Sequence, residues 1–277
     1  MNAQATLKSP IAFDGVGLHT GVACAVEVRP SGIDSGLSFV LSGNVRVAAV
    51  AENVVATSLA TAIGTGEASV STVEHLLSAL FGMGVSNAEI HVSGPEIPVA
   101  DGSGKTFADA IVTVGLLDQR AARAALRLVE PLYLRAGDRA LVALPADRFR
   151  VRFLADFAAP IGAQYFDGEI SPALYRDDIC AARTFAYLRD VEGMRARGLA
   201  QGGSLDNALV FDEDGPMRPM RWPNEVVRHK VLDLLGDFAL LGAWPFLDVL
   251  AIKSGHQLHC EATRALRDRN VSIARGA

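Results

Sequence analysis

The chain has six histidines, and two of them have neighbours whose types are suited to binding a metal. His229 and Asp233 are four residues apart, so in a helix they share one face, with Asp237 one turn further along. His75 follows Glu74 near an expected helix start, where the positive end of the helix dipole favours the neutral imidazole that a metal requires. Two imidazoles and one carboxylate form the ligand set of a catalytic zinc ion, which keeps its fourth position open.

Hydrolysis is the chemistry that this ligand set favours. Zinc lowers the pKa of water from about 15.7 to about 7, so hydroxide forms at neutral pH when a neighbouring base accepts the proton. Glu74 is adjacent to a predicted ligand and needs no metal bond of its own. The sequence therefore predicts a zinc hydrolase in which His75, His229 and Asp233 bind the metal and Glu74 is the general base.

Structural alternatives exist for both segments. Ser71 and Glu74 have the spacing of a capping box, so Glu74 could simply close a helix N-terminus. The stripe from His229 to Asp237 lies opposite apolar residues and could be a solvated face stabilised by an ion pair. Gly236 argues against a solvated face. Glycine inside a helix costs about 1 kcal/mol relative to alanine, which suggests that another group approaches closely there.

The other histidines carry weaker signals. His256 directly follows an expected strand, and strand-end loops often hold catalytic groups, although a single loop histidine is usually inert. His91 shares one strand face with Glu89, so we interpret the two as an exposed pair without a function. His259 and Cys260 could suggest another metal site, but the sequence shows no matching partners for them.

The elements that must position these residues recur in one order along the two halves of the chain. Short apolar and β-branched runs broken by Gly, Ser and Asn predict strands before residue 64 and again from Leu126 to Ala155. In each half, a helix, a strand and a second helix complete the order. The expected helices are Val73–Phe81, Thr106–Leu117, Tyr187–Arg197, Pro223–Leu241 and Glu261–Arg267. We predict a pseudo-duplicated α+β protein with an N-terminal domain (residues 1–120) and a C-terminal domain (residues 125–277).

Composition and charge exclude several classes of function. The net charge of -5 and the absence of a Lys/Arg run provide no basic surface for a phosphate backbone, so we expect no nucleic acid partner. The N-terminus lacks the apolar stretch of a secretory signal, and the most apolar segment is shorter than the roughly 20 residues of a membrane span. Three widely spaced cysteines fit neither a disulfide framework nor a thiolate metal site. We expect a cytoplasmic monomer without a transmembrane segment.

Several motifs together resemble one family, the UDP-3-O-acyl-N-acetylglucosamine deacetylases (LpxC), which catalyse the committed step of lipid A biosynthesis. The resemblance covers nearly the whole chain, and many motifs in the same order are far more specific than any one of them. They are Gly15-Val-Gly-Leu-His-Thr-Gly21, Ser71-Thr-Val-Glu-His-Leu76, Pro95-Glu-Ile-Pro98 with Asp101-Gly-Ser103, Ala182-Arg-Thr-Phe185, Gly202-Gly-Ser204, Val227-Arg-His-Lys-Val-Leu-Asp233 with Gly236-Asp237, and Lys253-Ser-Gly-His256.

The resemblance implies a role for each matching residue. His75, His229 and Asp233 would bind zinc, and Glu74 would be the base. The remaining roles concern the leaving group, the oxyanion and the substrate. The acid would be His256, supported by Asp237; Thr184 would stabilise the oxyanion; Lys230 and Phe185 would contact the acylated UDP-sugar, and His19 would line the site.

The family fold implied is two β-α-α-β domains that form a sandwich with the helices between the sheets. Each domain would carry a small insert, the second at about residues 185–210, where an apolar passage guides the acyl chain.

Departures from the family pattern affect substrate contacts rather than the proposed ligands. Ser69 replaces a common basic residue, Ala159-Pro160 replaces a His-Pro pair, Arg139 replaces a lysine and His259 replaces an asparagine. A deacetylase for a different acylated sugar and a non-catalytic paralogue stabilised by zinc are therefore alternatives. Iron(II) could replace zinc, because divalent selectivity depends on availability as well as affinity.

Overall fold

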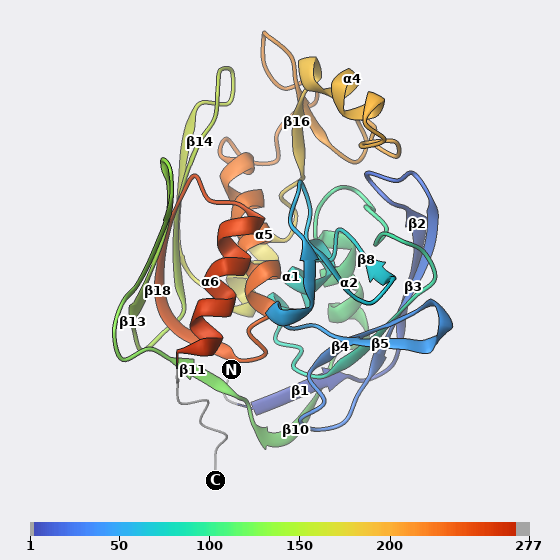
Figure 1. Cartoon of the computed structure of the whole chain (residues 1–277), viewed down its shortest axis with the longest axis vertical. Helices are drawn as coiled ribbons and strands as arrows, with labels where there is room; N and C mark the ends of the chain where they lie inside the picture. The colour runs from blue at the N-terminus through green and yellow to red at the C-terminus, as the bar shows by residue number, and fades with distance from the viewer. Residues whose placement is uncertain (1–2, 270–277) are drawn as a thin grey trace.

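The computed structural model describes residues 3–269 and arranges them in layers, with helices between two sheets (Figure 1). The described helices are α1 (Glu74–Met83), α2 (Lys105–Val114), α3 (Pro172–Leu174), the π-helix η3 (Tyr175–Ile179), α4 (Leu188–Ala196), α5 (Glu225–Ala239) and α6 (His256–Asp268), with short 3-10 turns η1 (Ser42–Asn44) and η2 (Ala51–Asn53). The α+β class and the sandwich arrangement predicted from the sequence are confirmed.

Strands of the N-terminal half form one main sheet, with smaller pairings beside it. The main sheet has the order β2-β3-β9-β4-β5, while β1 pairs with β10 and β6-β7-β8 form a separate small sheet. The bounds are β1 (Ala3–Leu7), β2 (Ile11–Val16), β3 (Ala23–Pro30), β4 (Leu37–Leu41), β5 (Val45–Ala48), β6 (Val54–Ala56), β7 (Ala62–Thr65), β8 (Ala68–Val70), β9 (Ala88–Val92) and β10 (Leu116–Ala122).

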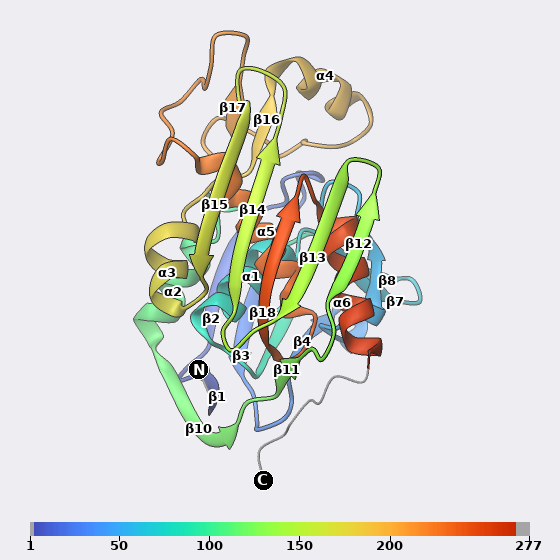
Figure 2. The ribbon, with the colours of Figure 1, turned by 90° about the vertical axis from the view of Figure 1, so that its left-hand side faces the viewer.

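Strands of the C-terminal half form the second main sheet, in the order β12-β13-β18-β14-β15 with β11 beside β18 (Figure 2). In both sheets the last strand lies in the middle and runs parallel to the third strand of the set, which is β4 in one sheet and β14 in the other. This shared order supports the predicted duplication, which stays a prediction. The bounds are β11 (Ala125–Arg127), β12 (Leu132–Ala136), β13 (Arg139–Pro145), β14 (Arg150–Asp156), β15 (Ala163–Glu169), β16 (Phe185–Tyr187), β17 (Leu209–Phe211) and β18 (Trp244–Ile252).

The two central helices, α1 and α5, pack directly against each other between the sheets. Gly236 makes this possible, because a Cβ atom at that position would lie 2.1 Å from the backbone oxygen of Glu74. The close approach predicted from Gly236 is therefore confirmed, and the approaching group is the first turn of α1. The buried stripe of α5 also shows that the solvated-face interpretation of His229, Asp233 and Asp237 is wrong.

Most predicted elements are present, with several differences in their limits. α6 begins at His256, five residues before the expected helix, with Gly255 in an extended conformation as its N-cap. The predicted strand from Leu126 to Leu134 is two strands, and β15 was not predicted because Gly168 and polar residues interrupt its alternation. The expected domain boundary falls beside β10, which pairs with β1. The division into two domains stays a prediction.

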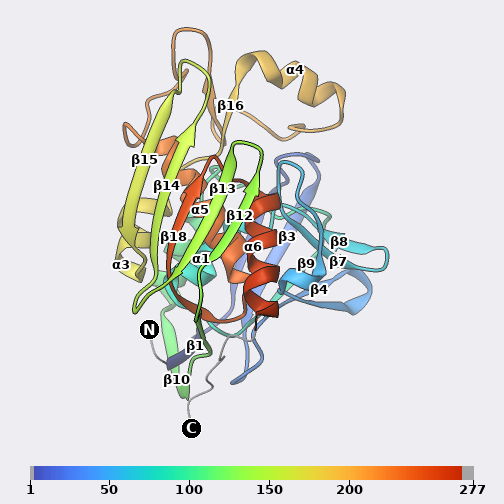
Figure 3. The same cartoon turned by 60° about the vertical axis from the view of Figure 1, so that its left-hand side comes forward.

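The segment from β16 through α4 to β17 projects from one end of the molecule (Figure 3). It occupies the position expected for the second insert, and β16 and β17 pair in parallel to form its base. Within residues 3–269, no helix combines the length and the apolar character needed to cross a membrane.

Candidate active site and metal centre

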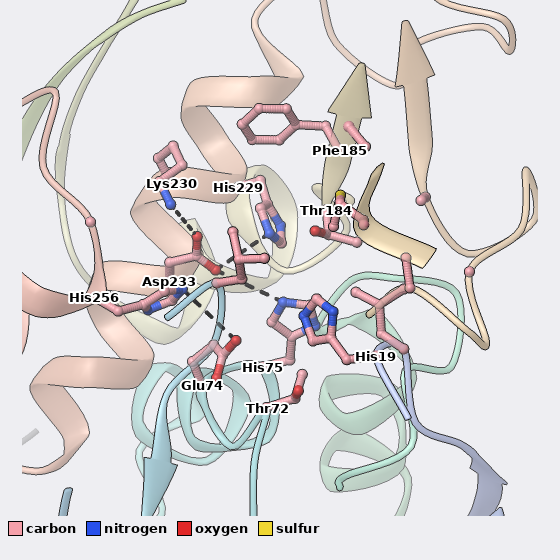
Figure 4. Close-up of a pocket in the computed structure, with 18 of the residues that line it drawn as sticks. His19, Thr72, Glu74, His75, Thr184, Phe185, His229, Lys230, Asp233 and His256 are labelled. Atoms are coloured by element: carbon pink, nitrogen blue, oxygen red, sulfur yellow. Dashed lines mark hydrogen bonds and ion pairs between the residues drawn. The ribbon is translucent and has the colours of Figure 1, made fainter. Parts of the chain in front are cut away.

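Helices α1 and α5 bring His75, His229 and Asp233 together at the junction of the two halves (Figure 4). Nε2 of His75 lies 3.8 Å from Oδ1 of Asp233, and Nε2 of His229 lies 3.3 Å from the same oxygen. Tetrahedral ligands placed about 2.0 to 2.1 Å from a metal ion lie about 3.3 Å apart. These separations therefore fit one shared metal ion, and all three side chains are buried.

The hydrogen bonds around this triad involve outward-facing atoms of His229 and Asp233, so the inward-facing atoms of these two residues remain available to a metal. Nδ1 of His229 is 3.0 Å from the carbonyl oxygen of Ala182, which makes Nδ1 the donor and leaves Nε2 as a free lone pair. Lys230 donates to Oδ2 of Asp233 at 2.6 Å. Oδ1 of Asp233 is buried and accepts no hydrogen bond. A buried carboxylate oxygen without a donor is costly, and a metal ion would remove that cost.

The protonation states of the triad also suit a metal. Burial lowers the pKa of His75 to about 3, and burial likewise lowers the pKa of His229, so both imidazoles are neutral at pH 7. Burial alone would raise the pKa of Asp233, but His229 and Lys230 outweigh it and hold that pKa below its ordinary range. Neutral imidazoles and an ionised carboxylate are the forms in which these groups bind metals.

Glu74 lies at the start of α1 with its carboxylate facing the triad. The capping-box interpretation is wrong, because α1 begins at Glu74 itself and no side chain caps it. Instead, Oε2 of Glu74 accepts a hydrogen bond from the backbone N–H of Thr61 at 3.0 Å. Burial raises the pKa of Glu74 to about 7. A carboxylate with a pKa near neutrality can both accept and release a proton at physiological pH.

His256, the first residue of α6, lies across the site from the triad. Its Nδ1 is 2.9 Å from Oδ2 of Asp237, and its Nε2 is 3.9 Å from Oε1 of Glu74. Burial opposes protonation, but the attraction of Asp237 outweighs it and raises the pKa of His256 to about 9. Asp237 itself is buried, and the nearby His256 overcomes the effect of burial and keeps its pKa below the ordinary range. The pair thus places an imidazolium N–H beside the Glu74 carboxylate.

Thr184, in the loop before β16, and Phe185, the first residue of β16, enter the site together. The backbone N–H of Thr184 donates to the carbonyl of Gly102 at 2.7 Å, which fixes this loop to the N-terminal half. Arg183 and Glu225 form a buried ion pair at 2.8 Å that fixes the same loop to the start of α5. The ring of Phe185 lies edge-on to His229 with centroids 6.2 Å apart. Sequence reasoning missed both members of the ion pair, although Arg183 lies inside a quoted motif.

Glu96 holds His19 at the mouth of the site. The carboxylate of Glu96 is fully buried and accepts hydrogen bonds from the backbone N–H groups of His19 and Thr20. It also accepts a hydrogen bond from the hydroxyl of Thr72, a residue with a positive φ of 56°. Gly17 is required here, because a Cβ atom at that position would lie 2.2 Å from Glu96. The sequence singled out His19 but not Glu96, whose motif was noted without a role.

The metal-binding candidates and the residues around them line one cavity of about 680 Å³. Its polar end holds the triad, Glu74, His256 and Lys230. The other walls are largely apolar and come mainly from the insert, with Phe185, Leu188, Val191, Met194, Leu205, Ala208 and Val210. Every site residue predicted from the sequence lines this cavity except Asp237, which lies behind His256.

A sequence model of the family described as UDP-3-O-acyl N-acetylglycosamine deacetylase matches residues 4–268. The chain belongs to this family. Three curated relatives, each named UDP-3-O-acyl-N-acetylglucosamine deacetylase, agree. The one from Anaeromyxobacter sp. (strain Fw109-5) is 45% identical and covers 92% of this chain and 86% of its own length. Those from Nostoc sp. and Geobacter sp. (strain M21) are 41% and 40% identical, cover 95% and 96% of this chain, and 98% and 89% of their own lengths.

This deacetylase family consists of metalloenzymes, and the described part of this member offers two groups of residues that could hold a metal. The first is His75, His229 and Asp233, and the second is Asp237, His256 and His259. The resemblance predicted from the sequence is confirmed by the match. The second group was not expected, because sequence reasoning considered His259 only together with Cys260.

Proposed function

We propose that this chain is a zinc-dependent deacetylase that removes the N-acetyl group from UDP-3-O-(3-hydroxyacyl)-N-acetylglucosamine and releases acetate, in lipid A biosynthesis. The observation that carries the proposal is Oδ1 of Asp233, a buried oxygen without a donor that faces Nε2 of two neutral imidazoles. Beside it stands Glu74, a carboxylate with a pKa near 7. The family and its relatives' names supply the substrate class.

His75, His229 and Asp233 would hold the zinc ion, which supplies Lewis-acid activation of water and of the amide carbonyl. The same donors fit iron(II). Lys230 supports the ligand set by binding Oδ2 of Asp233, which keeps that carboxylate ionised and leaves Oδ1 facing inward. Ala182 fixes the ring of His229 through its carbonyl. These contacts preorganise the ligands before substrate arrives.

The chain's own groups then move two protons. Glu74 accepts the proton of the attacking water at Oε1, because Oε2 is occupied by the N–H of Thr61. The hydroxyl of Thr184 donates to the oxyanion of the tetrahedral intermediate. His256 donates its Nε2 proton to the departing amine, while Asp237 holds the opposite side of the ring at Nδ1. General acid and base groups of this kind contribute about 10²- to 10⁴-fold each.

The shape of the cavity suits an acylated sugar. The apolar walls from residues 185–210 would accept the acyl chain, whereas Lys230, Phe185 and His19 would contact the sugar nucleotide. Arg139 also lines the cavity and would bring positive charge towards an anionic diphosphate, whereas the ammonium of the lining residue Lys253 is paired with Asp138 and Asp156. We further propose that the protein acts as a cytoplasmic monomer built from two duplicated domains that meet at this site.

Acetate release by the protein carrying one zinc equivalent tests the proposal. Glu74→Ala should abolish turnover while the metal content stays unchanged, because Glu74 is not a ligand. Glu89→Ala is the matched control, since Glu89 pairs with Arg46 and His91 on the partly exposed face of β9 and does not line the cavity. A Glu74→Ala variant that keeps most of its rate would refute the assigned base. Comparing acyl-chain lengths and nucleotide groups would separate the proposed substrate from another acylated sugar.

A further inference from the structure

His259 lies behind His256 on the buried face of α6 and contacts the same carboxylate oxygen. Its Nδ1 is 2.9 Å from Oδ2 of Asp237, the distance that also separates Nδ1 of His256 from that oxygen. Nε2 of His259 is 2.8 Å from the hydroxyl of Ser254, which is itself buried. The side chain is 0% exposed, so water cannot replace either contact.

The hydrogen-bonding partners determine where the proton of His259 lies. An ionised Asp237 can only accept, so Nδ1 of His259 must carry a hydrogen. Burial lowers the pKa of His259, which keeps the ring neutral with a single N–H. Nε2 is therefore an acceptor, and the hydroxyl of Ser254 donates to it. Asp237 thus selects the tautomer, and the Ser254 hydroxyl stabilises it by donating to Nε2.

Asp237, His256 and His259 could hold a metal by composition alone, but their hydrogen bonds argue for another role. Oδ1 of Asp237 accepts the hydroxyl of Thr61 at 2.6 Å, and Oδ2 accepts from both imidazoles. None of these three side chains has a buried polar atom without a partner. A cation here would have to break three hydrogen bonds to a carboxylate before binding.

We propose that His259 is a positioning residue, which holds the Asp237 carboxylate in the orientation that directs the Nε2 proton of His256 towards the leaving amine. This inference rests on the proposed function for its catalytic consequence. With His259 on one side of Oδ2 and His256 on the other, the carboxylate cannot rotate towards either ring. The hydrogen bond from His259 also reduces the negative charge on Oδ2. It therefore weakens the electrostatic attraction between Asp237 and protonated His256.

The titratable and charged groups acting around His256 come from several elements, so a pH effect must be assigned by paired variants. They are Asp237 and Asp233 from α5, Glu74 and His75 from α1, His259 from α6, and His19 in the cavity wall; Lys230 from α5 acts on His259. Among residues 3–269, only His259 shares the oxygen that His256 binds.

Two amide variants separate the two contacts of His259. The side-chain nitrogen of asparagine occupies roughly the place of Nδ1, whereas that of glutamine reaches the place of Nε2. His259→Asn should keep the bond to Asp237 and hold kcat within about threefold of the parent. His259→Gln should keep only the bond to Ser254 and lower kcat by about tenfold or more, with KM unchanged. In the glutamine variant the descending limb of the kcat–pH profile should move to higher pH, because Asp237 then binds His256 alone.

A measurement without substrate keeps this inference separate from the proposed activity. Proton–nitrogen correlation spectra of histidine-labelled protein should show His259 neutral with its hydrogen on Nδ1, and Ser254→Ala should weaken that preference. A hydrogen on Nε2 of His259 in the parent protein, or equal kcat and pH profiles for the Asn and Gln variants, would overturn the proposal. Parent protein that shows the expected tautomer but no acetate release would instead refute the proposed function alone. Thermal unfolding of both variants checks that each one folds.

Discussion

Two clusters in this molecule each contain two histidines and one aspartate, and their aspartates, Asp233 and Asp237, lie one helical turn apart on α5. The clusters differ in their hydrogen bonds. His75, His229 and Asp233 include a carboxylate oxygen without a donor, and Asp237, His256 and His259 include none. In the first cluster Nδ1 of His229 donates outward to the carbonyl oxygen of Ala182, which leaves its Nε2 lone pair facing Asp233. In the second cluster both imidazoles donate N–H groups to one carboxylate oxygen. Two imidazoles and an aspartate are therefore not enough to indicate a metal site. A buried ligand atom without a hydrogen-bond partner, such as Oδ1 of Asp233, is the feature that distinguishes the first cluster.

The largest difference between the clusters should appear when the same change is made to each aspartate. Asp233→Asn weakens a proposed ligand, so metal affinity should fall by more than the roughly 10- to 100-fold that follows loss of a supporting contact, with turnover falling to background. Asp237→Asn should keep the metal and lose turnover only in part. Competition with a chelator measures both affinities. Equal losses of metal from the two variants would contradict the comparison.

His256, the proposed acid in the second cluster, should affect the rate of turnover but not the binding of metal. His256→Gln removes the proton donor, and kcat should fall by about 10²- to 10⁴-fold while metal content and KM stay near those of the parent. His91→Gln is the matched control, because His91 pairs with Glu89 on a strand away from the cavity. If the His256 variant also lost its metal, His256 would belong to the ligand set.

The pH dependence of kcat/KM should reflect two groups: Glu74, which lies beside the first cluster, and His256, which belongs to the second. Glu74 must be ionised to accept a proton, so activity should rise with pH through its pKa of about 7. His256 must be protonated to donate, so activity should fall as pH rises through its pKa of about 9. The charge of a bound cation lowers both values, so each limb should lie at or below them. A profile rising steadily to pH 10 would exclude His256 as the acid.

Much of this site follows from the sequence, because residues four apart on a helix must share a face. The spacing of His229, Asp233 and Asp237 predicts their stripe, and Gly236 predicts the close approach of another element. The second half of the ligand set cannot be derived in this way. Nothing local to His75 shows that α1 packs on α5, so its grouping with His229 and Asp233 rested on residue types and on the resemblance to a family.

Long-range contacts of ordinary residues are the part that sequence reasoning missed. Thr61 is separated from Asp237 by 176 positions, and it binds that carboxylate through its hydroxyl and Glu74 through its backbone N–H. Glu96 and Glu225 are likewise buried carboxylates whose partners lie on other segments. A threonine or glutamate gives no local signal of such a role, since most of these residues lie on the surface.

Thr61→Val should have the smallest effect of the series, because it removes only one of three donors to Asp237. The two imidazoles still hold Oδ2, and the backbone N–H of Thr61 still binds Glu74, so kcat should fall by only about two- to fivefold. Unfolding should become easier by about 1 to 3 kcal/mol, because Oδ1 is left buried without a donor. Thr61→Ser, which keeps the hydroxyl, should recover most of both losses. A Thr61→Val rate as low as that of His256→Gln would mean that the threonine, rather than the histidines, fixes the carboxylate.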